Sequence, residues 1–312
     1  MYNYNKLCND FLQYKKSLGY KYNTDTVVIN SIKKYLIDNN VEIITKETIE
    51  KYVKLNNNLD TNTIARNMNV FKELCKYLEL QRISCYQIPN KIYTRKKNKF
   101  IPYIFSHDEI KLIYSNLNII NTDYHYSYYQ KIIYPIIIKI LYQTGMRIGE
   151  ILNLKIQDYS YEKQLFHLKN TKNNQERLII LPEKLNQEIK VYYRKFLLDK
   201  TDDHLLFLTS HTSIEKYFYK ILKTSNIKRY ENKPRLHDLR HTFVVHNFEK
   251  IMKTKNDINI FLPVLQKYLG HQSLNSLSYY FSLTRNILND VNNVSEINLG
   301  YLIPKIGDEY EE

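Results

Sequence analysis

The sequence predicts a mainly α-helical fold with two domains and one small antiparallel β-sheet. Apolar residues recur every three to four positions along most of the chain, which is the spacing of one helix face. This spacing is interrupted by a basic segment between Pro89 and Pro102, and by a short region after Gln164 in which strand-like patterns replace it. A chain of 312 residues is long enough for two domains that each bury a core.

Residues 1–90 are predicted to form an N-terminal helical bundle. Leu7, Phe11 and Leu18 lie at helical spacing, and Gly19 then offers the left-handed residue that often ends a helix. Further helices are expected over residues 24–38, 45–55 and 61–78. Because no strand-like alternation occurs in this part of the chain, the first domain is expected to be all α.

Residues 91–102 are predicted to form an extended basic linker, since a proline stands near each end of this segment. Its basic side chains are Lys91, Arg95, Lys96, Lys97 and Lys99. A lone basic run is usually a solvated segment, but between two domains of a basic protein it can follow a nucleic-acid backbone.

Residues 103–285 are predicted to form the second domain, which is mainly helical. Ser106 and Glu109 stand at the two ends of a capping-box pattern, which starts a helix. Two strands are expected over residues 165–168 and 177–181, joined by a polar turn rich in asparagine. Helical spacing resumes after these strands, so the sheet is expected to be small.

The chain is strongly basic. Lysine and arginine number 46 against 32 aspartate and glutamate residues, which gives a formal net charge of +14. Each contact with a phosphate releases counterions, so such a surplus favours a polyanionic partner such as nucleic acid. Net charge alone does not distinguish a protein that binds nucleic acid from one whose surface is merely basic.

The cysteines and the apolar segments indicate a cytoplasmic protein. Cys8, Cys75 and Cys85 are too few, and odd in number, for a disulfide framework, so all three are expected to be reduced. The most apolar stretch, residues 132–141, is far shorter than the roughly 20 residues that cross a bilayer. The start of the chain has no apolar run of the signal-peptide kind.

Three short segments contain side chains suited to phosphate chemistry. They are Thr144-Gly145-Met146-Arg147, His237-Asp238-Leu239-Arg240-His241, and Leu269-Gly270-His271 followed nine positions later by Tyr280. Taken singly, each has an ordinary explanation. Arg147 and Glu150 have the spacing of a surface ion pair, His237 and His241 that of two metal ligands on a helix, and His271 that of a helix cap.

Together these segments resemble the tyrosine recombinase, or phage integrase, family. The family's four boxes, which end in a tyrosine nine residues after a Leu-Gly-His box, are matched in order and spacing across residues 105–283. The resemblance implies that residues 1–90 are the family's core-binding domain and that residues 103–285 are its catalytic domain. Thirty tyrosines make any single tyrosine a weak signal, so only the neighbouring residues distinguish Tyr280.

The resemblance also implies roles in phosphoryl transfer. Arg147 and Arg240 match the two arginines that bind the phosphate, where charge grows in the transition state. Tyr280 matches the nucleophile that becomes joined to the 3′ phosphate. His237 matches the histidine that accepts its proton, and His271 matches a second hydrogen-bond donor to the phosphate. Glu150 is expected to orient Arg147 from one helical turn away.

Two assignments depend on which of two nearby residues is aligned with the family's catalytic position. The family's general acid is a lysine on the turn between two strands, and Lys172 occupies the middle of that turn, with Lys169 as the alternative. Tyr279 is the alternative nucleophile to Tyr280. His241 has no catalytic counterpart in the resemblance and is expected to pack or hydrogen-bond within its own helix.

The predicted function is site-specific DNA recombination through a 3′-phosphotyrosyl bond, without a metal ion or another cofactor. The motifs contain no HExxH, no carboxylate cluster and no GxxxxGK[ST], so metal-dependent hydrolysis and ATP use lack their usual residues. The expected partners are specific sites on double-stranded DNA and three further copies of the chain in a tetramer, with no membrane. An integrase of a mobile element is favoured over a chromosome resolvase. The alternatives are a nicking-closing enzyme of the type IB topoisomerase kind and a catalytically silent DNA-binding regulator on the same fold.

Residues 286–312 are expected to form a C-terminal tail. Its apolar residues recur at helical spacing: Ile287, Leu288, Val291 and Val294. Such a stripe must pack against protein, either its own domain or, as the resemblance implies, a neighbouring subunit.

Overall fold

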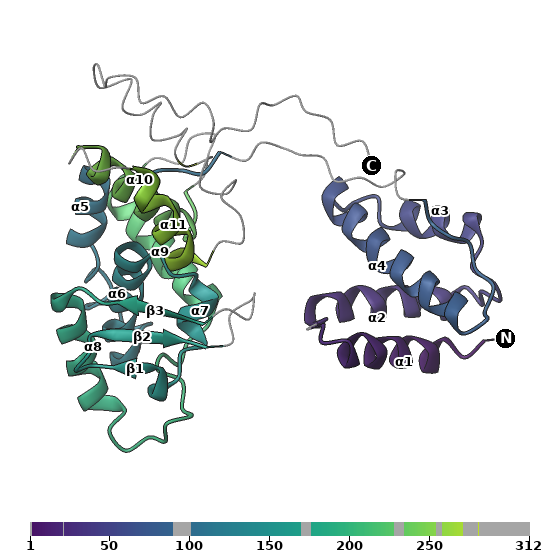
Figure 1. Cartoon of the computed structure of the whole chain (residues 1–312), viewed down its shortest axis with the longest axis horizontal. Helices are drawn as coiled ribbons and strands as arrows, with labels where there is room; N and C mark the ends of the chain where they lie inside the picture. The colour runs from purple at the N-terminus through teal and green to yellow at the C-terminus, as the bar shows by residue number, and fades with distance from the viewer. Residues whose placement is uncertain are drawn as a thin grey trace. The chain divides into compact units, whose positions relative to one another are not determined.

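The computed structural model describes residues 2–20, 22–89, 101–169, 176–227, 234–253, 258–270 and 280. The chain divides into two compact units, Met1–Phe100 and Ile101–Glu312, and each has a core of its own. The described residues form helices and one three-stranded antiparallel sheet (Figure 1), which confirms the predicted mainly helical class. No helix in these ranges combines the length and the apolar character that crossing a bilayer requires.

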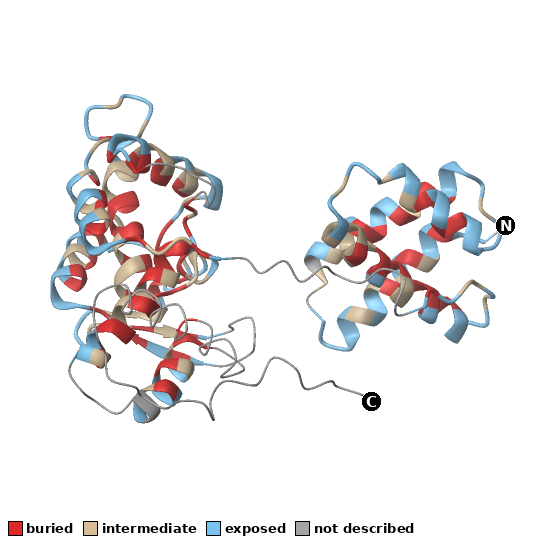
Figure 2. Ribbon diagram, turned by 90° about the horizontal axis from the view of Figure 1, so that it is seen from above, coloured by how far each residue is buried: buried red, intermediate tan, exposed pale blue. Residues whose placement is uncertain are grey.

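The first unit is a bundle of four helices in its described part. They are α1 (Tyr4–Ser17), α2 (Asn23–Asp38), α3 (Lys46–Leu55) and α4 (Thr61–Leu80). Phe11, Tyr52 and Phe71 are fully buried between them. Figure 2 shows that the buried parts of these helices face the interior of the unit and that the exposed parts face outward. Gly19 has φ +83° just after α1, which confirms the predicted stop.

The predicted linker lies almost entirely outside the described residues. Only its last two positions, 101 and 102, are described. The five basic side chains proposed for DNA contact (Lys91, Arg95, Lys96, Lys97 and Lys99) are not among the described residues.

The second unit contains the remaining elements. Its helices are α5 (His107–Ser115), α6 (Tyr128–Thr144), α7 (Ile148–Leu152), η1 (Ile156–Asp158), α8 (Glu183–Phe196), α9 (His211–Thr224), α10 (Asp238–Lys253) and α11 (Ile258–Leu269). The predicted capping box at the start of α5 is present, with Ser106 and Glu109 each accepting a backbone N–H of the other. The core is formed largely by isoleucine and aromatic side chains of α6, α8 and α9.

The sheet has one strand more than the sequence predicts. Its strands are β1 (Tyr159–Ser160), β2 (Leu165–Leu168) and β3 (Arg177–Ile180), in the order β1-β2-β3. β2 and β3 pair in the predicted antiparallel sense, with Phe166 opposite Ile179. β1 was missed because two residues are too short to show a period-two pattern.

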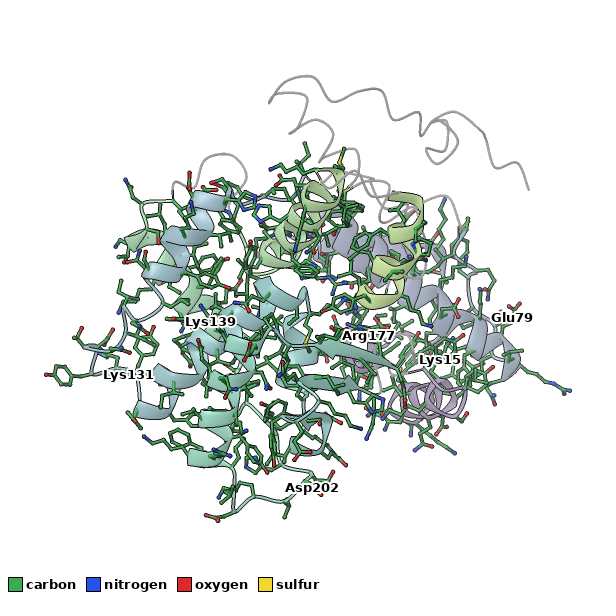
Figure 3. All side chains as sticks on the ribbon, turned by 60° about the vertical axis from the view of Figure 1, so that its left-hand side comes forward. Lys15, Glu79, Lys131, Lys139, Arg177 and Asp202 are labelled. Atoms are coloured by element: carbon green, nitrogen blue, oxygen red, sulfur yellow. The ribbon has the colours of Figure 1, made fainter. Side chains whose placement is uncertain are left out.

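Strand β3 turns an arginine inward. Arg177 and Ile179 are buried, whereas Leu178 and Ile180 are 54% and 70% exposed. Because side chains alternate along a strand, this register fixes a positive charge on the protein side of the sheet. Arg177 lies where β3 meets the end of α11 (Figure 3).

Candidate active site

The corner between α6 and α7 places Arg147. Gly145 caps α6 with φ +63°, and a Cβ at this position would lie 2.4 Å from a ring carbon of Phe243 on α10. Glycine therefore satisfies both a left-handed backbone and a close approach of α10. Arg147 follows as the N-cap of α7, with its side chain directed to Glu150.

Glu150 joins two arginines. Its Oε1 accepts a hydrogen bond from Arg147 Nη1 at 2.9 Å, and its Oε2 accepts one from Arg177 Nη2 at 2.7 Å. The backbone N–H of Arg147 also donates to Oε2, at 2.9 Å. Burial alone would raise the pKa of Glu150, but this N–H and the charges of Arg177 and Arg147 outweigh it and lower the pKa. Glu150 is therefore ionised at neutral pH, as its predicted orienting role requires.

Arg177 belongs to this cluster, although the sequence reasoning assigned it no role. Its side chain is 6% exposed, and its buried Nε has no hydrogen-bond partner among the described residues. A Cβ on Gly270 would lie 3.0 Å from its Nη1, so the turn that precedes His271 packs directly on the guanidinium. The signal in the sequence was the alternation of β3, which puts residues 177 and 179 on one face.

Arg240 connects three distant segments. Its Nη1 donates to the carbonyl of Gly145 and its Nη2 to the carbonyl of Leu269, the latter at 2.8 Å. The residue is 2% exposed. Burial lowers the pKa of Arg240, since desolvation disfavours its charge, and the nearby charge of Arg147 adds to this effect. A desolvated cation beside a second arginine favours an anion between them.

His237 precedes α10 and is close to both predicted phosphate-binding arginines. Its side chain is exposed to solvent, yet the surrounding protein still desolvates the ring. This desolvation, followed by the positive charges of Arg240, Arg235 and Arg147, lowers the pKa of His237 to about 4. The imidazole is therefore neutral at pH 7.

Tyr280 is buried against α10, and its hydroxyl contacts His241. Tyr280 Oη and His241 Nδ1 are 2.5 Å apart. Tyr280 also packs with Val245 and Phe248 in an apolar cluster. The expectation that His241 packs or bonds only within its own helix is therefore wrong. The side chain of His241 instead reaches Tyr280, which lies 39 residues further along the chain.

Several predicted site residues lie outside the described ranges. These are Lys172, His271 and Tyr279. Lys169, the alternative general acid, is described, and its Nζ lies 4.0 Å from Asp158 Oδ1 at the edge of the sheet. The described part of the chain thus brings together Arg147, Glu150, His237, Arg240 and Tyr280 of the predicted set, and adds Arg177 and His241.

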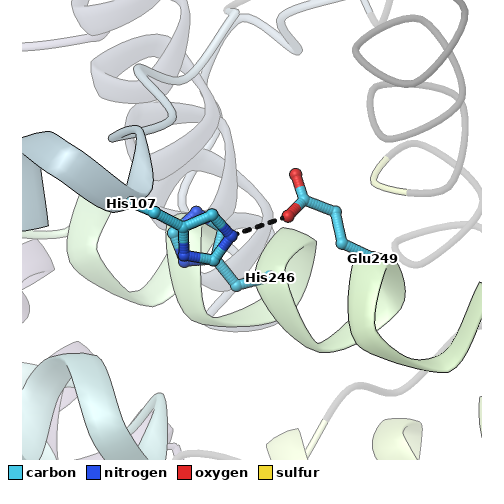
Figure 4. Close-up of side chains that lie close together, drawn as sticks. All are labelled: His107, His246 and Glu249. Carbon is cyan, nitrogen blue, oxygen red and sulfur yellow. Dashed lines mark hydrogen bonds and ion pairs between the residues drawn. The ribbon is translucent and has the colours of Figure 1, made fainter. Parts of the chain in front are cut away.

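A separate group of potential metal ligands lies at the junction of α5 and α10 (Figure 4). His107, His246 and Glu249 place one ligand atom each within 4.8 Å of one another. His107 Nε2 bonds Glu249 Oε2 at 3.0 Å, the two imidazole rings stack at 3.9 Å, and His246 Nδ1 bonds the hydroxyl of Tyr142 at 2.9 Å. These contacts explain the group as a link between the two helices.

The arrangement at Arg240 suits transfer of a phosphoryl group to a tyrosine. The guanidinium groups of Arg147 and Arg240 are close enough for their charges to interact, a carboxylate fixes the first of them, and a phenol hydroxyl lies beside an imidazole. On a mainly helical domain with a small antiparallel sheet, this combination defines a tyrosine recombinase. Proteins of this class cleave and rejoin DNA at specific sites.

Comparison with known proteins gives the family. The phage integrase family model matches residues 104–286, and the chain belongs to this family. The tyrosine recombinase XerA of Pyrococcus furiosus is 32% identical over 154 residues, which cover 48% of this chain and 50% of the relative. The tyrosine recombinase of Pseudothermotoga lettingae is 25% identical over 286 residues, which cover 87% and 91%. The chain thus spans half the length of the first relative and most of the second.

Solved structures share the fold. The XerH recombinase bound to palindromic difH substrate, in a post-cleavage complex, matches with a TM-score of 0.62 and 20% identity over 93% of this chain and 84% of that one. A lambda integrase dimer bound to a core site matches with a TM-score of 0.58 and 16% identity over 86% and 95%.

Proposed function

We propose that this chain is a site-specific DNA recombinase in which Tyr280 is the nucleophile. The phenol oxygen attacks a backbone phosphorus, a Tyr280–phosphate bond forms at the 3′ side, and the bond to the 5′ oxygen breaks. Reversal of the same step on another strand rejoins the DNA. The observation that carries the proposal is the position of Tyr280, which is buried beside α10 and close enough to Arg240 for their charges to interact.

The reaction requires the protein to ease ionisation of the phenol oxygen and to stabilise the charge on the phosphate oxygens. A phenol with an ordinary pKa near 10 costs roughly 4 kcal/mol to ionise at pH 7. Negative charge also grows on the phosphate oxygens, and we assign its stabilisation to Arg147 and Arg240. The resemblance implies His237 as the acceptor of the Tyr280 proton, His271 is proposed to hydrogen-bond the phosphate, and Lys172 is proposed to protonate the leaving 5′ oxygen.

The partners follow from the reaction. XerH is bound to its difH substrate and lambda integrase to a core site as a dimer, so we propose that this chain also binds a specific duplex site. Exchange between two duplexes needs four active sites, and a homotetramer is the proposed working form. An integrase of a mobile element acting in the cytoplasm fits this reaction, and the net charge of +14 suits its substrate.

The domain roles are proposed on the same basis. Residues 1–90 serve as the core-binding domain, residues 91–102 follow the DNA backbone, and residues 103–285 hold the active site. Residues 286–312 are proposed to dock on a neighbouring subunit.

A nicked suicide substrate tests the proposal. The small fragment after the nick is lost on cleavage, so a covalent adduct accumulates and is seen on a denaturing gel. Tyr280→Phe should bind DNA normally and form no adduct, whereas Tyr279→Phe should form it. The reverse result would move the nucleophile to Tyr279. Relaxation of supercoils by the monomer without strand exchange would instead favour a nicking-closing enzyme.

A further inference from the structure

The hydroxyl of Tyr280 contacts a histidine to which the sequence motifs assign no chemistry. The 2.5 Å between His241 Nδ1 and Tyr280 Oη is a hydrogen bond, and the two ring centroids are 5.4 Å apart. The side chain of His241 is 14% exposed, so water reaches it only in part. A nitrogen this close to a hydroxyl oxygen has the geometry of a base for that hydroxyl.

The tautomer that this contact requires is supported by Asp238. If Nδ1 accepts the phenolic proton, Nε2 carries the other hydrogen, and Nε2 lies 4.0 Å from Asp238 Oδ1. The side chain of Asp238 is 1% exposed and lies one turn earlier on α10. Its negative charge favours the imidazolium that would form, which is the role of the carboxylate in a hydroxyl–histidine–carboxylate series.

The other charged and titratable groups near His241 set the limits of this effect. Arg235 Nη2 donates to the same Asp238 oxygen at 3.1 Å, and Arg240 is the residue immediately before His241 on the helix. Both cations oppose a proton on His241. The ring of His237 meets that of His241 edge-on, with centroids 4.8 Å apart, and is neutral at pH 7.

We propose that His241, in place of the His237 that the resemblance implies, is the residue that takes the proton from Tyr280 during DNA cleavage, and that Asp238 is a positioning residue for it. This inference rests on the proposed function. As the Tyr280 oxygen bonds to phosphorus, its proton moves to His241 Nδ1. The 5′ oxygen leaves with a proton from the general acid, so charge and atoms balance. In rejoining, His241 returns its proton to Tyr280. His237 is then free to hydrogen-bond the phosphate.

Single-turnover cleavage of a suicide substrate separates this role from a packing role. His241→Asn keeps a polar atom where Nδ1 lies but cannot accept a proton at neutral pH. We expect its cleavage rate to fall by about 10²-fold or more, with DNA affinity and thermal stability close to wild type. His246→Asn is the matched control on the same helix outside the site, and it should cleave at the normal rate.

Two further readouts respond to proton transfer alone. The wild-type rate should rise with pH as the base loses its proton, and this rise should be absent in His241→Asn. Added imidazole should restore part of the cleavage by His241→Ala, in proportion to its unprotonated form. A substrate with sulfur in place of the bridging 5′ oxygen leaves without an acid, so it should repair loss of the general acid but leave the His241→Asn defect in place.

The outcomes are distinct. A His241→Asn protein with the wild-type rate and pH profile overturns the inference, as does a defect that the sulfur substrate repairs. If adduct forms on Tyr280 in the wild type while His241→Asn cleaves normally, the inference fails and the proposed function stands. If Tyr280→Phe still forms the adduct, the proposed function itself fails.

Asp238→Asn tests the positioning role. The asparagine oxygen can still accept the backbone N–H of Arg235, which Asp238 Oδ2 accepts at 2.7 Å, so the start of α10 should be preserved. We expect a smaller loss of rate than in His241→Asn, and we expect the double variant to cleave at the same rate as His241→Asn alone. Additive losses in the double variant would contradict a role through His241.

Discussion

The two units of the chain bury different kinds of side chain. In the described part of the first unit, the buried residues are apolar or aromatic, apart from Thr48. The described part of the second unit buries charged residues as well: Arg177, Asp238, Arg240 and Glu249. Buried charges cost stability unless they are paired, so their presence in one unit calls for a reason beyond folding.

The partners of these charged residues distinguish those that link helices from those that belong to the candidate site. Glu249 is paired with His107, and this pair links α5 and α10. Arg240 instead donates to the backbone carbonyls of Gly145 and Leu269, and the charges of Arg147 and Glu150 are close enough to act on it. Arg177 and Arg240 therefore belong to the candidate site of the second unit, whereas Glu249 does not.

The largest effect is expected from Arg240. Arg240→Ala should reduce adduct formation by about 10²–10³-fold or more, because one of two phosphate forks is lost. It should also lower the melting temperature, since the carbonyls of Gly145 and Leu269 lose their donor. Arg240→Lys keeps the charge and should recover part of the rate. Normal cleavage by Arg240→Ala would remove this residue from the site.

A core substitution in the first unit should affect stability without touching the chemistry. Phe71→Ala removes a fully buried ring and should lower the free energy of unfolding by about 3–5 kcal/mol in a denaturant titration. Leu80→Ala, at a position 69% exposed, is the control and should change it by less than about 0.5 kcal/mol. At saturating DNA and low temperature, Phe71→Ala should still form adduct. A loss as large as that of Arg240→Ala would erase the contrast between the units.

Arg177 tests whether one buried charge contributes both to stability and to DNA cleavage. Arg177→Met leaves Glu150 with one of its two arginines and should cost about 3 kcal/mol of unfolding free energy. Cleavage should fall with little change in DNA affinity, because Arg147 loses a fixed partner. The double variant Arg177→Met with Glu150→Met should regain stability but not cleavage. Leu178→Thr, on the exposed face of β3, is the control, and an equal loss there would point to the strand itself.

The smallest expected effect is a dependence of stability on pH. The pKa of His237 is about 4 in the folded chain and near 6.5 when unfolded, so the unfolded state binds the proton first as pH falls. The free energy of unfolding should therefore decrease between pH 6.5 and pH 4, by an amount that solvent screening at this exposed ring reduces. His237→Asn should flatten this decrease. An unchanged slope would mean that other groups cause it.

Local patterns in the sequence predicted much of the fold and part of the site. Helical spacing located the helices, and the motifs located Arg147, Glu150, Arg240 and Tyr280 because each stands in a short segment with a recognisable order. β1 was missed because a strand of two residues has no period.

The two missed site residues show what local patterns cannot predict. Arg177 was overlooked because arginine is expected at the surface, and only the register of β3 turns it inward. His241 was assigned to its own helix because its partner, Tyr280, is 39 residues away in sequence. A contact between distant segments depends on how the whole domain packs.

The bonds of Arg240 bear on how this chain would change over evolution. The guanidinium holds Gly145 and Leu269 together across separations of 95 and 29 residues, so the domain needs it whether or not DNA is cut. A descendant that lost recombination would no longer need the hydroxyl of Tyr280 for chemistry, and a phenylalanine there would keep an aromatic ring in the same apolar cluster. The same descendant would keep Arg240 to remain folded. Arg240 in an inactive relative would then indicate only common descent. The presence of Tyr280 and His241 would indicate that the relative is still active.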